Sequence, residues 1–250
     1  MRKSKTFSII ILIITALIIS ACGMKIDLPG IVRGSGNVIT EERSVSGFEY
    51  IDFNGAGEIF IEQGSEEKLV IEAEDNILPK ITNKVENSVL TLGLDTKITD
   101  EQVIPTKKMV FRLTVITLSG LNINGAATLN VKQLFAGDFE FNVNGTGNAT
   151  FEDFQAEKLT VEIDGGGNVT FKGLVPEQVV VINGAGDYNA GDLQTGDTSI
   201  TFNGAGKSTV WVLDDLTIEI NGAGSVDYYG DPHVTQSITG LGSVKPMGNK

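Results

Sequence analysis

The chain of 250 residues has one cysteine and one histidine, and only 6 of its residues are prolines. One cysteine rules out a framework of intramolecular disulfides, and one histidine leaves little from which to build a zinc site. Basic residues are also scarce, with 19 lysines and arginines against 32 acidic residues, a net charge of −13. Because nucleic-acid phosphates bind basic surfaces, this balance argues against a nucleic-acid partner. We therefore expect no metal, no other cofactor and no nucleic acid.

Glycine, by contrast, is abundant, at 30 of 250 residues. Hydrophobic residues make up 41% of the chain and charged residues 20%, a composition that is neither that of a disordered chain nor that of a collagen. The length fits one large domain or two small ones.

The first residues have the pattern of an export signal. Three of the first five residues are basic, and an apolar run follows from Phe7 to Ile19. Small residues then precede the only cysteine, Cys22. A basic start, a short apolar stretch and small residues before a cut site are typical of a secretory signal peptide.

The segment Ile19-Ser20-Ala21-Cys22 resembles the lipobox of bacterial lipoproteins. The resemblance implies removal of a signal peptide at 1–21 and a diacylglycerol thioether on the sulfur of Cys22, which would anchor the protein to a membrane. Residues 22–44 would then hold the lipidated cysteine and a tether. Residues 22–250 keep 16 basic and 32 acidic residues, a net charge of −16. The alternative is an uncleaved anchor, for which the apolar run is short, since a spanning helix needs about 20 residues.

A four-residue motif recurs from residue 54 onward. Its first residue is asparagine or aspartate, its second residue is glycine, and from residue 124 the copies are spaced by 20, 20, 19, 20 and 18 residues. A fixed period indicates one structural unit for each copy. The first residues of the copies are Asn54, Asn124, Asn144, Asp164, Asn183, Asn203 and Asn221.

Apolar and polar residues alternate on both sides of this motif. The residues one and three positions before it are apolar in all seven copies, and the residue between them is polar in six. This alternation predicts a strand with one buried face. The glycines between two such strands suit a sharp corner with positive φ. After the motif, one more column is formed by Ile61, Val131, Phe151, Phe171, Ala190, Val210 and Tyr228.

A strand, a corner and a second strand within 18–20 residues predict one rung of an all-β, right-handed parallel β-helix. The unit is too short for a helical repeat or a propeller blade, whereas rungs stacked at about 4.8 Å share one continuous interior. We predict a single β-helix domain over 45–245, regular over 121–245 and with irregular rungs and longer loops over 58–120. A β-sandwich is the alternative fold, and a small separate sheet is the alternative for 58–120.

Stacked rungs would place the first residues of the motif above one another. We expect these residues to form a ladder in which each side-chain amide donates to its neighbour, a structural role that we favour over ligand binding. The alanines at the third position, such as Ala56 and Ala205, are expected to point into the interior, where the corner leaves room only for a methyl group.

The acidic residues offer little support for catalysis. An inverting glycosidase needs two carboxylates about 6.5–9.5 Å apart. Asp153 and Asp192 come nearest to this separation. Counting along the repeat puts them two rungs apart, which is about 9.6 Å, with Gly173 on the rung between them. Arg112, the only arginine beyond residue 43, and the lone His233 offer no paired base for lyase chemistry. We therefore predict that the protein is not an enzyme, and a polysaccharide-degrading enzyme is the weakest alternative.

Binding is the better class of function, and two aromatic residues in successive rungs are candidates for it. Trp211 and Tyr229 each lie eight positions after the start of a motif, so they are candidate contacts for a glycan or a surface protein. We favour a structural role for them over this one, as a cover on the thin end of the core.

Four features together resemble one bacterial family. They are the lipobox, Phe48-Glu49-Tyr50-Ile51 ahead of the first motif, the recurrent Asn-Gly-Ala-Gly motif, and Tyr229-Gly230-Asp231-Pro232 followed by Gly240-Leu241-Gly242. Over about 45–245 the chain is similar to the family called putative auto-transporter adhesin, head GIN domain. The resemblance implies a right-handed β-helix on an exported or lipid-anchored protein. It implies adhesion less strongly, and it supplies no catalytic residues.

Together these observations predict a lipid-anchored protein of the cell envelope that acts as an adhesin or a binding scaffold. In a two-membrane organism we expect the anchor in the outer membrane, since Gly23 after the cysteine is not an acidic retention signal; in a one-membrane organism we expect it in the cell membrane. The alternative is a periplasmic or envelope accessory protein that binds a partner protein.

Overall fold

The computed structural model describes residues 30–94 and 102–250. Two compact units divide the chain, Met1–Ile31 and Val32–Lys250, and nearly all described residues belong to the second. The signal peptide and Cys22 lie outside the described residues, so the predictions about them stay predictions. Within the described ranges, no helix is long and apolar enough to cross a membrane.

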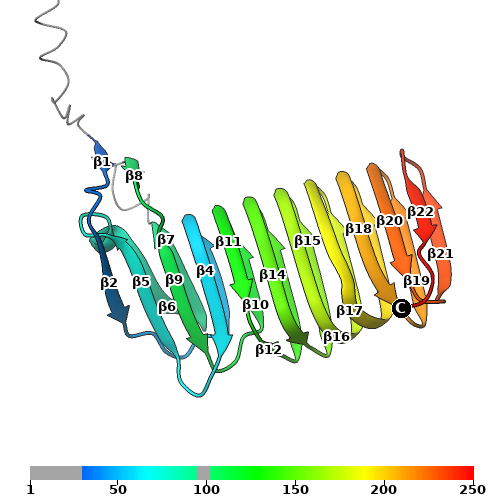
Figure 1. Cartoon of the computed structure of the whole chain (residues 1–250), viewed down its shortest axis with the longest axis horizontal. Helices are drawn as coiled ribbons and strands as arrows, with labels where there is room; N and C mark the ends of the chain where they lie inside the picture. Colours follow the sequence, from blue (N-terminus) through cyan, green and yellow to red (C-terminus); the bar gives the residue numbers. More distant parts are fainter. Residues whose placement is uncertain (1–29, 95–101) are drawn as a thin grey trace, which may run out of the picture. The chain divides into compact units, whose positions relative to one another are not determined.

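The unit Val32–Lys250 is a β-solenoid in which strands of successive turns lie side by side (Figure 1). Each regular turn has one strand before the glycine motif and one after it. The strands before the motif are β3 (Tyr50–Asn54), β10 (Gly120–Ile123), β13 (Asp138–Val143), β15 (Lys158–Ile163) and β19 (Asp215–Ile220). The strands after it are β4 (Ala56–Gln63), β11 (Ala126–Val131), β14 (Thr146–Gln155), β18 (Ala205–Val212) and β20 (Ala223–Tyr229).

Several other elements complete the described chain. The long strands β16 (Gly166–Ile182) and β17 (Ala185–Phe202) each run from one side of the solenoid to the other, and β12 (Leu134–Phe135) pairs with β14. The strands β21 (His233–Ile238) and β22 (Ser243–Pro246) form the last turn. The strands β1 (Ile31–Arg33) and β8 (Gln102–Ile104) pair in a separate two-stranded sheet.

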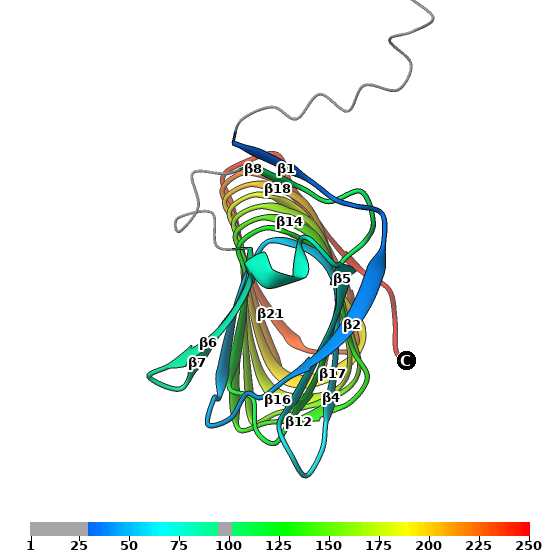
Figure 2. The ribbon, with the colours of Figure 1, turned by 90° about the vertical axis from the view of Figure 1, so that its left-hand side faces the viewer.

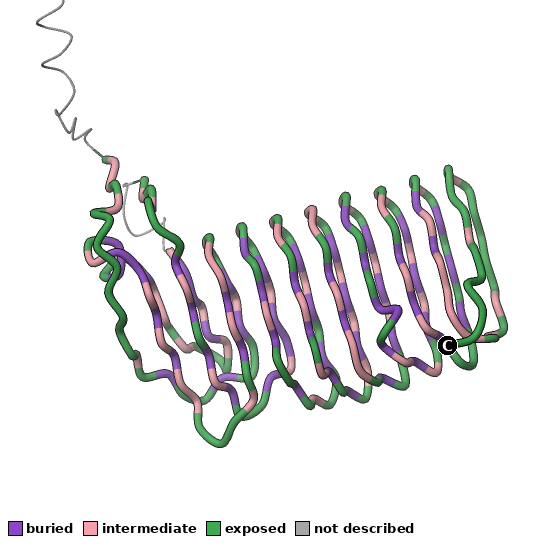
Figure 3. Tube along the Cα trace, in the orientation of Figure 1, coloured by how far each residue is buried: buried purple, intermediate pink, exposed green. Residues whose placement is uncertain are grey.

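Residues one period apart lie opposite each other in parallel strands. In β13, β15 and β16, Phe141 is aligned with Val161 and Val161 with Val180. All three side chains are fully buried. The predicted stack of parallel rungs with a period of 18–20 residues is therefore confirmed, and the β-sandwich alternative is wrong. Buried and exposed residues alternate along the turns, as Figure 3 shows.

The interior is a single apolar column that runs from Val45 to Val226. Its middle part is filled by aromatic rings, with Phe151 stacked on Phe171 at a centroid distance of 4.1 Å and an interplanar angle of 8°. Phe154 packs edge-on against both rings. Because each buried side chain of this size contributes about 1.5–3 kcal/mol, the column supplies the cohesion that the chain lacks from disulfides.

The alanines of the motif point outward, so the expectation that they face the interior is wrong. Ala56 and Ala205 are both exposed. The residue that approaches the neighbouring turn is the glycine before the alanine, since a Cβ on Gly204 would lie only 1.9 Å from the carbonyl oxygen of Gly184. Gly204 does not have a positive φ. Glycine is needed at this position because two backbones meet there.

The described strands within 58–120, apart from β8, share the sheet and the core but do not follow the expected order. The strands β3 and β4 stack directly on β10 and β11, so the intervening residues form no turn between them. The strands β7 (Val89–Leu94) and β9 (Val110–Val115) instead lie on the opposite side of β3 and β4. These strands therefore lie against the core of the regular turns without being stacked in chain order. The exception is β8, which pairs with β1 in the two-stranded sheet.

Antiparallel strands then close the N-terminal end of this solenoid. They are β2 (Val38–Arg43), β5 (Lys68–Glu74) and β6 (Ile81–Glu86), and the short helix η1 (Leu78–Lys80) connects β5 to β6. Figure 2 looks at this end and shows η1 and β2 in front of the stacked turns. A terminal turn with a bare apolar end would be unstable in water, which explains why this end departs from the repeat.

Two buried polar contacts fix this cap. The Arg43 guanidinium donates to the carbonyl oxygens of Ile81 at 2.6 Å and Leu78 at 2.7 Å. The carboxylate of Glu74, which is 1% exposed, accepts hydrogen bonds from the backbone N–H groups of Gly36 and Thr106. Burial raises the pKa of Glu74, but a hydrogen bond from the Thr106 hydroxyl, together with these backbone bonds, outweighs burial and brings the pKa below its ordinary value.

The close approach at the corner makes a first prediction. Gly204→Ala should lower the free energy of unfolding by about 1–3 kcal/mol, because the added methyl group forces two backbones apart. Ala205→Ser, one residue further and exposed, should leave the melting temperature unchanged. Thermal melts followed by circular dichroism measure both variants, and an unaltered melt for Gly204→Ala would contradict the proposed packing.

Candidate functional site

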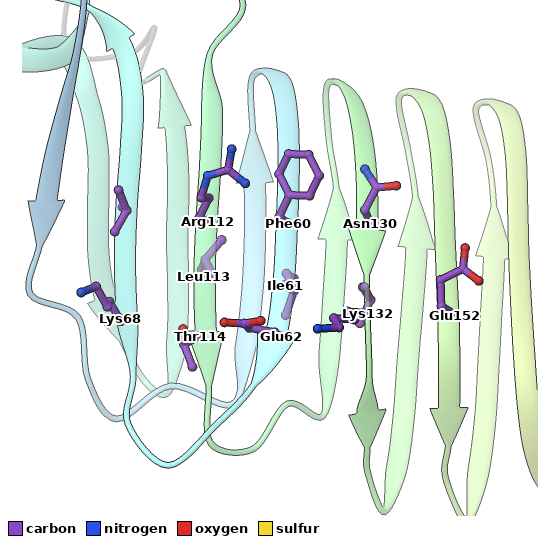
Figure 4. A pocket seen from close by; sticks show the side chains of 12 residues that line it. Phe60, Ile61, Glu62, Lys68, Arg112, Leu113, Thr114, Asn130, Lys132 and Glu152 are labelled. Carbon is purple, nitrogen blue, oxygen red and sulfur yellow. The ribbon is translucent and has the colours of Figure 1, made fainter.

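A groove of about 480 Å³ lies on the outward face of the sheet, over β5, β9, β4 and β11 (Figure 4). Its volume is in the range of small-ligand sites. Side chains from these four strands and from β14 line it in two rows that cross the strands. The groove therefore exists because stacked strands bring together residues that are far apart in the sequence.

The first row combines an aromatic ring with a cation. Strand register places Val70 opposite Arg112, Arg112 opposite Phe60, and Phe60 opposite Asn130. The Arg112 guanidinium carbon lies 4.8 Å from the centroid of the Phe60 ring, a contact worth about 0.5–1 kcal/mol at an exposed site. The Arg112 Nε also donates to the Glu72 carboxylate at 3.1 Å. These two contacts hold the arginine across the groove.

The second row alternates in charge. Register aligns Lys68, Thr114 and Glu62. Lys132 follows directly after β11, and Glu152 lies on β14 (Figure 4). A hydrogen bond and the charge of Glu42, whose Oε2 lies 2.7 Å from Lys68 Nζ, raise the pKa of Lys68. This row gives the groove charged groups of both signs.

Glu62 and Lys132 are the charged members of the row that are free to meet a ligand. The backbone N–H of Lys132 donates to the carbonyl oxygen of Ile61, which places the two residues next to each other on adjacent strands. In the part of the chain that the structure describes, neither side chain has a hydrogen bond or an ion pair. One offers donors and the other offers acceptors.

These residues are equipped for binding. An aromatic ring flanked by an amide, a carboxylate and an ammonium group can contact an apolar surface and hydrogen-bond to hydroxyl or amide groups around it. Among residues 30–94 and 102–250, no group of three or more histidine, cysteine, aspartate or glutamate side chains could hold a metal ion.

The first residues of the motif donate to one another in two runs. In the first run, Asn124 Nδ2 donates to Asn54 Oδ1 at 3.1 Å and Asn144 Nδ2 to Asn124 Oδ1 at 2.8 Å. The second run begins at Asp164, and its bonds are those from Asn183 to Asp164, from Asn203 to Asn183 and from Asn221 to Asn203, at 2.7, 2.8 and 3.1 Å. The runs are separate because a carboxylate at Asp164 has no N–H to donate to Asn144.

A second ladder, which the sequence analysis did not predict, lies two residues earlier. Asn122 Nδ2 donates to Asp52 Oδ1 at 2.6 Å, and Asn142 Nδ2 donates to Asn122 Oδ1 at 2.8 Å. Its signal was present in the sequence, as polar residues recurring between the two apolar columns.

Trp211 and Tyr229 lie opposite each other in β18 and β20. Both are half-buried and face outward, whereas Val210 and Val212 on either side of Trp211 are buried. The interpretation that these aromatics cover the end of the core is therefore wrong. The Lys250 ammonium lies 5.5 Å from the Trp211 ring centroid and 5.2 Å from that of Tyr229, so a cation already occupies this aromatic patch.

The structure changes the register on which the pairing of the two candidate catalytic aspartates was based. Irregular register in β14 and β16 places Gly173 opposite Phe154 and Leu193, rather than between the aspartates. Asp153 accepts a hydrogen bond from Gln133 Nε2 at 2.7 Å. The Lys250 ammonium hydrogen-bonds to Asp192 and, with its charge, lowers the pKa of that carboxyl. Counting along the repeat failed because a β-bulge changes which residues face each other.

Sequence reasoning also missed the groove. Phe60 and Arg112 are 52 positions apart, and they meet only because β9 winds back beside β4. Arg112 stood out as the only arginine beyond residue 43, but nothing in the repeat assigns it a neighbour.

The fold and this site define a repetitive β-solenoid whose outward strand faces carry a polar and aromatic groove. The chain belongs to the family described as putative auto-transporter adhesin, head GIN domain, which matches residues 47–232. This match confirms the family resemblance.

Solved structures of similar proteins share this architecture. A protein from Bacteroides fragilis described as a putative adhesin is 26% identical, with a TM-score of 0.82 over 86% of this chain and 100% of that chain. Two proteins from Parabacteroides distasonis, described as a putative lipid binding protein and a putative adhesin, are 21% and 22% identical. Their TM-scores are 0.69 and 0.66, over 87% of this chain and 99% and 100% of theirs, and they show the fold alone. No curated protein matches the chain.

The interrupted ladder makes a second prediction. Asp164→Asn supplies an amide that can donate to Asn144, which would join the two runs and raise the free energy of unfolding by about 0.5–1.5 kcal/mol. Asn203→Leu removes one donated and one accepted bond and should lower it by about 1–3 kcal/mol.

Denaturant titrations of both variants, with Asn203→Asp as a control that keeps the acceptor, measure these changes. If Asn203→Leu melts like the unmodified protein, the ladder has no role in stability.

Proposed function

We propose that the protein is a lipid-anchored component of the cell envelope and that its solenoid acts as an adhesin or binding scaffold. Membership of the adhesin family supports the general class. The observation that carries the proposal for this chain is the groove, in which the unpaired side chains of Glu62 and Lys132 lie beside the Phe60–Arg112 contact.

The proposed anchor rests on the sequence. The short apolar stretch and the lipobox that ends at Cys22 support export and lipidation. Gly23, which follows the cysteine, favours the outer membrane in a two-membrane organism, and the cell membrane is the proposed site in a one-membrane organism. An acidic body would be repelled by anionic membranes and phosphate-bearing polymers, so attachment would depend on the lipid.

Anchoring and exposure can be tested on intact cells. We expect Cys22→Ser to abolish incorporation of a clickable fatty acid and to release the protein from the membrane fraction. We also expect added protease to remove the unmodified protein from intact cells while a periplasmic or cytoplasmic marker survives. A lipidated protein that resists protease until the cells are lysed would instead favour the alternative, an internal accessory protein of the envelope.

For the groove we propose a glycan ligand. Sugars present an apolar ring face together with hydroxyl groups that both donate and accept hydrogen bonds. Phe60 offers apolar surface, while Asn130 and the unpaired Glu62 and Lys132 offer groups of both kinds. The surrounding acidic surface favours neutral over polyanionic glycans.

A glycan array probed with fragment 23–250, which holds the whole compact unit Val32–Lys250, tests this assignment. Phe60→Ala and Asn130→Ala should each weaken binding of a hit about tenfold, equivalent to the loss of about 1.4 kcal/mol. Thr170→Ala, on the same outward face but outside the groove lining, is the matched control. A hit that survives Phe60→Ala and is lost in Trp211→Ala would move the site to the Trp211–Tyr229 patch.

A further inference from the structure

The two ends of the solenoid differ in the charge that their terminal strands carry. At the N-terminal end, the edge strands β2 and β6 both carry charged residues, which are Glu41, Glu42, Arg43, Lys84 and Glu86. Charges on an edge strand oppose pairing with another chain. At the C-terminal end, the segment 234–244, which holds most of β21 and the start of β22, has no charged residue at all.

The C-terminal end also leaves apolar side chains uncovered. The core column of Leu216, Ile218 and Ile220 in β19 continues to Val234, Gln236 and Ile238 in β21. Ile238 is 41% exposed, and Leu241 in the following corner is 84% exposed. No described element covers this turn in the way that η1, β2 and β6 cover the other end.

The backbone of β21 has a free edge of defined polarity. On its paired side, the His233 N–H donates to Asp214 at 2.7 Å and the Thr239 N–H donates to Ile220 at 2.9 Å. Neighbouring residues of a strand direct their N–H and C=O groups to alternate sides. The groups of residues 234, 236 and 238 therefore point away from β19, and no described strand pairs with them.

We propose that β21 pairs antiparallel with β21 of a second copy of this chain, about a two-fold axis that passes through Gln236. In this register Val234 lies opposite Ile238 of the partner subunit, and Gln236 lies opposite Gln236 of the partner subunit. The outward groups at positions 234, 236 and 238 then form about six hydrogen bonds, as in any antiparallel ladder. The arrangement is isologous, so one patch serves both subunits.

The absence of charge along this edge favours a second copy of the chain as the partner. The chain carries 32 acidic residues against 19 basic ones, so two copies repel each other across most of their surfaces. Residues 234–244 carry no charge, so two copies can meet at the β21 edge without bringing like charges together. The adjacent β22 carries Lys245 and Pro246, and because proline lacks an N–H it is a poor template for pairing, which assigns the contact to β21.

Disulfide trapping tests the register directly. Fragment 23–250 has no cysteine, since the only one is Cys22. Residues of a hydrogen-bonded antiparallel pair have Cα atoms about 5.5 Å apart, within the range that a disulfide bridges. Gln236→Cys should therefore form covalent dimers under mild oxidation roughly tenfold faster than Thr235→Cys, whose partner in this register is position 237.

A backbone substitution tests the same edge without cysteine. Gln236→Pro removes an N–H that points away from β19, so the ladder within the subunit is kept while the contact between subunits is lost. Sedimentation velocity in the high micromolar range should show dimers for the unmodified fragment and for Gln236→Thr, and monomers for Gln236→Pro, with similar melting temperatures. A monomeric unmodified fragment, or equal trapping rates for the two cysteine variants, would overturn the proposal.

Discussion

Parallel hydrogen bonding between equivalent residues of consecutive turns is the constraint on which the rest of the structure depends. It fixes the register of each strand, because a slip of one residue would move the apolar side chains to the outer face. It also requires adjacent backbones to approach at the corner, which only glycine permits at positions such as Gly204. The aromatic column inside and the amide ladders outside both follow from that alignment.

The regular half of the fold was predictable because its information is local and repeated. Alternating residues such as Phe141 and Val143 identify the buried face, and the recurring glycines locate the corners. The direction of the alanine at the third position was not predictable, because it depends on how the corner curves between two strands. The register at Asp192 was lost for a related reason, since a bulge changes a count without leaving a clear mark in the sequence.

The candidate site was the least predictable part. It lies where the winding order is broken, and its central pair, Phe60 and Arg112, belongs to strands that meet through a non-local return of the chain. A repeat predicts neighbours only within its own period, so it contains no information about such a meeting. The cap at Arg43 and Glu74 depends on equally distant contacts.

The interleaved winding of β3, β4, β7 and β9 has a consequence for how such proteins change length. Whole turns of 18–20 residues can be gained or lost in the regular region, each altering the reach of the solenoid by about 4.8 Å. The N-terminal region cannot be duplicated in that way, because both partners of β3 come later in the chain, so its strands do not form a separate turn of consecutive residues. The N-terminal region therefore has a constant length, and the number of turns that follow it sets the total length of the solenoid.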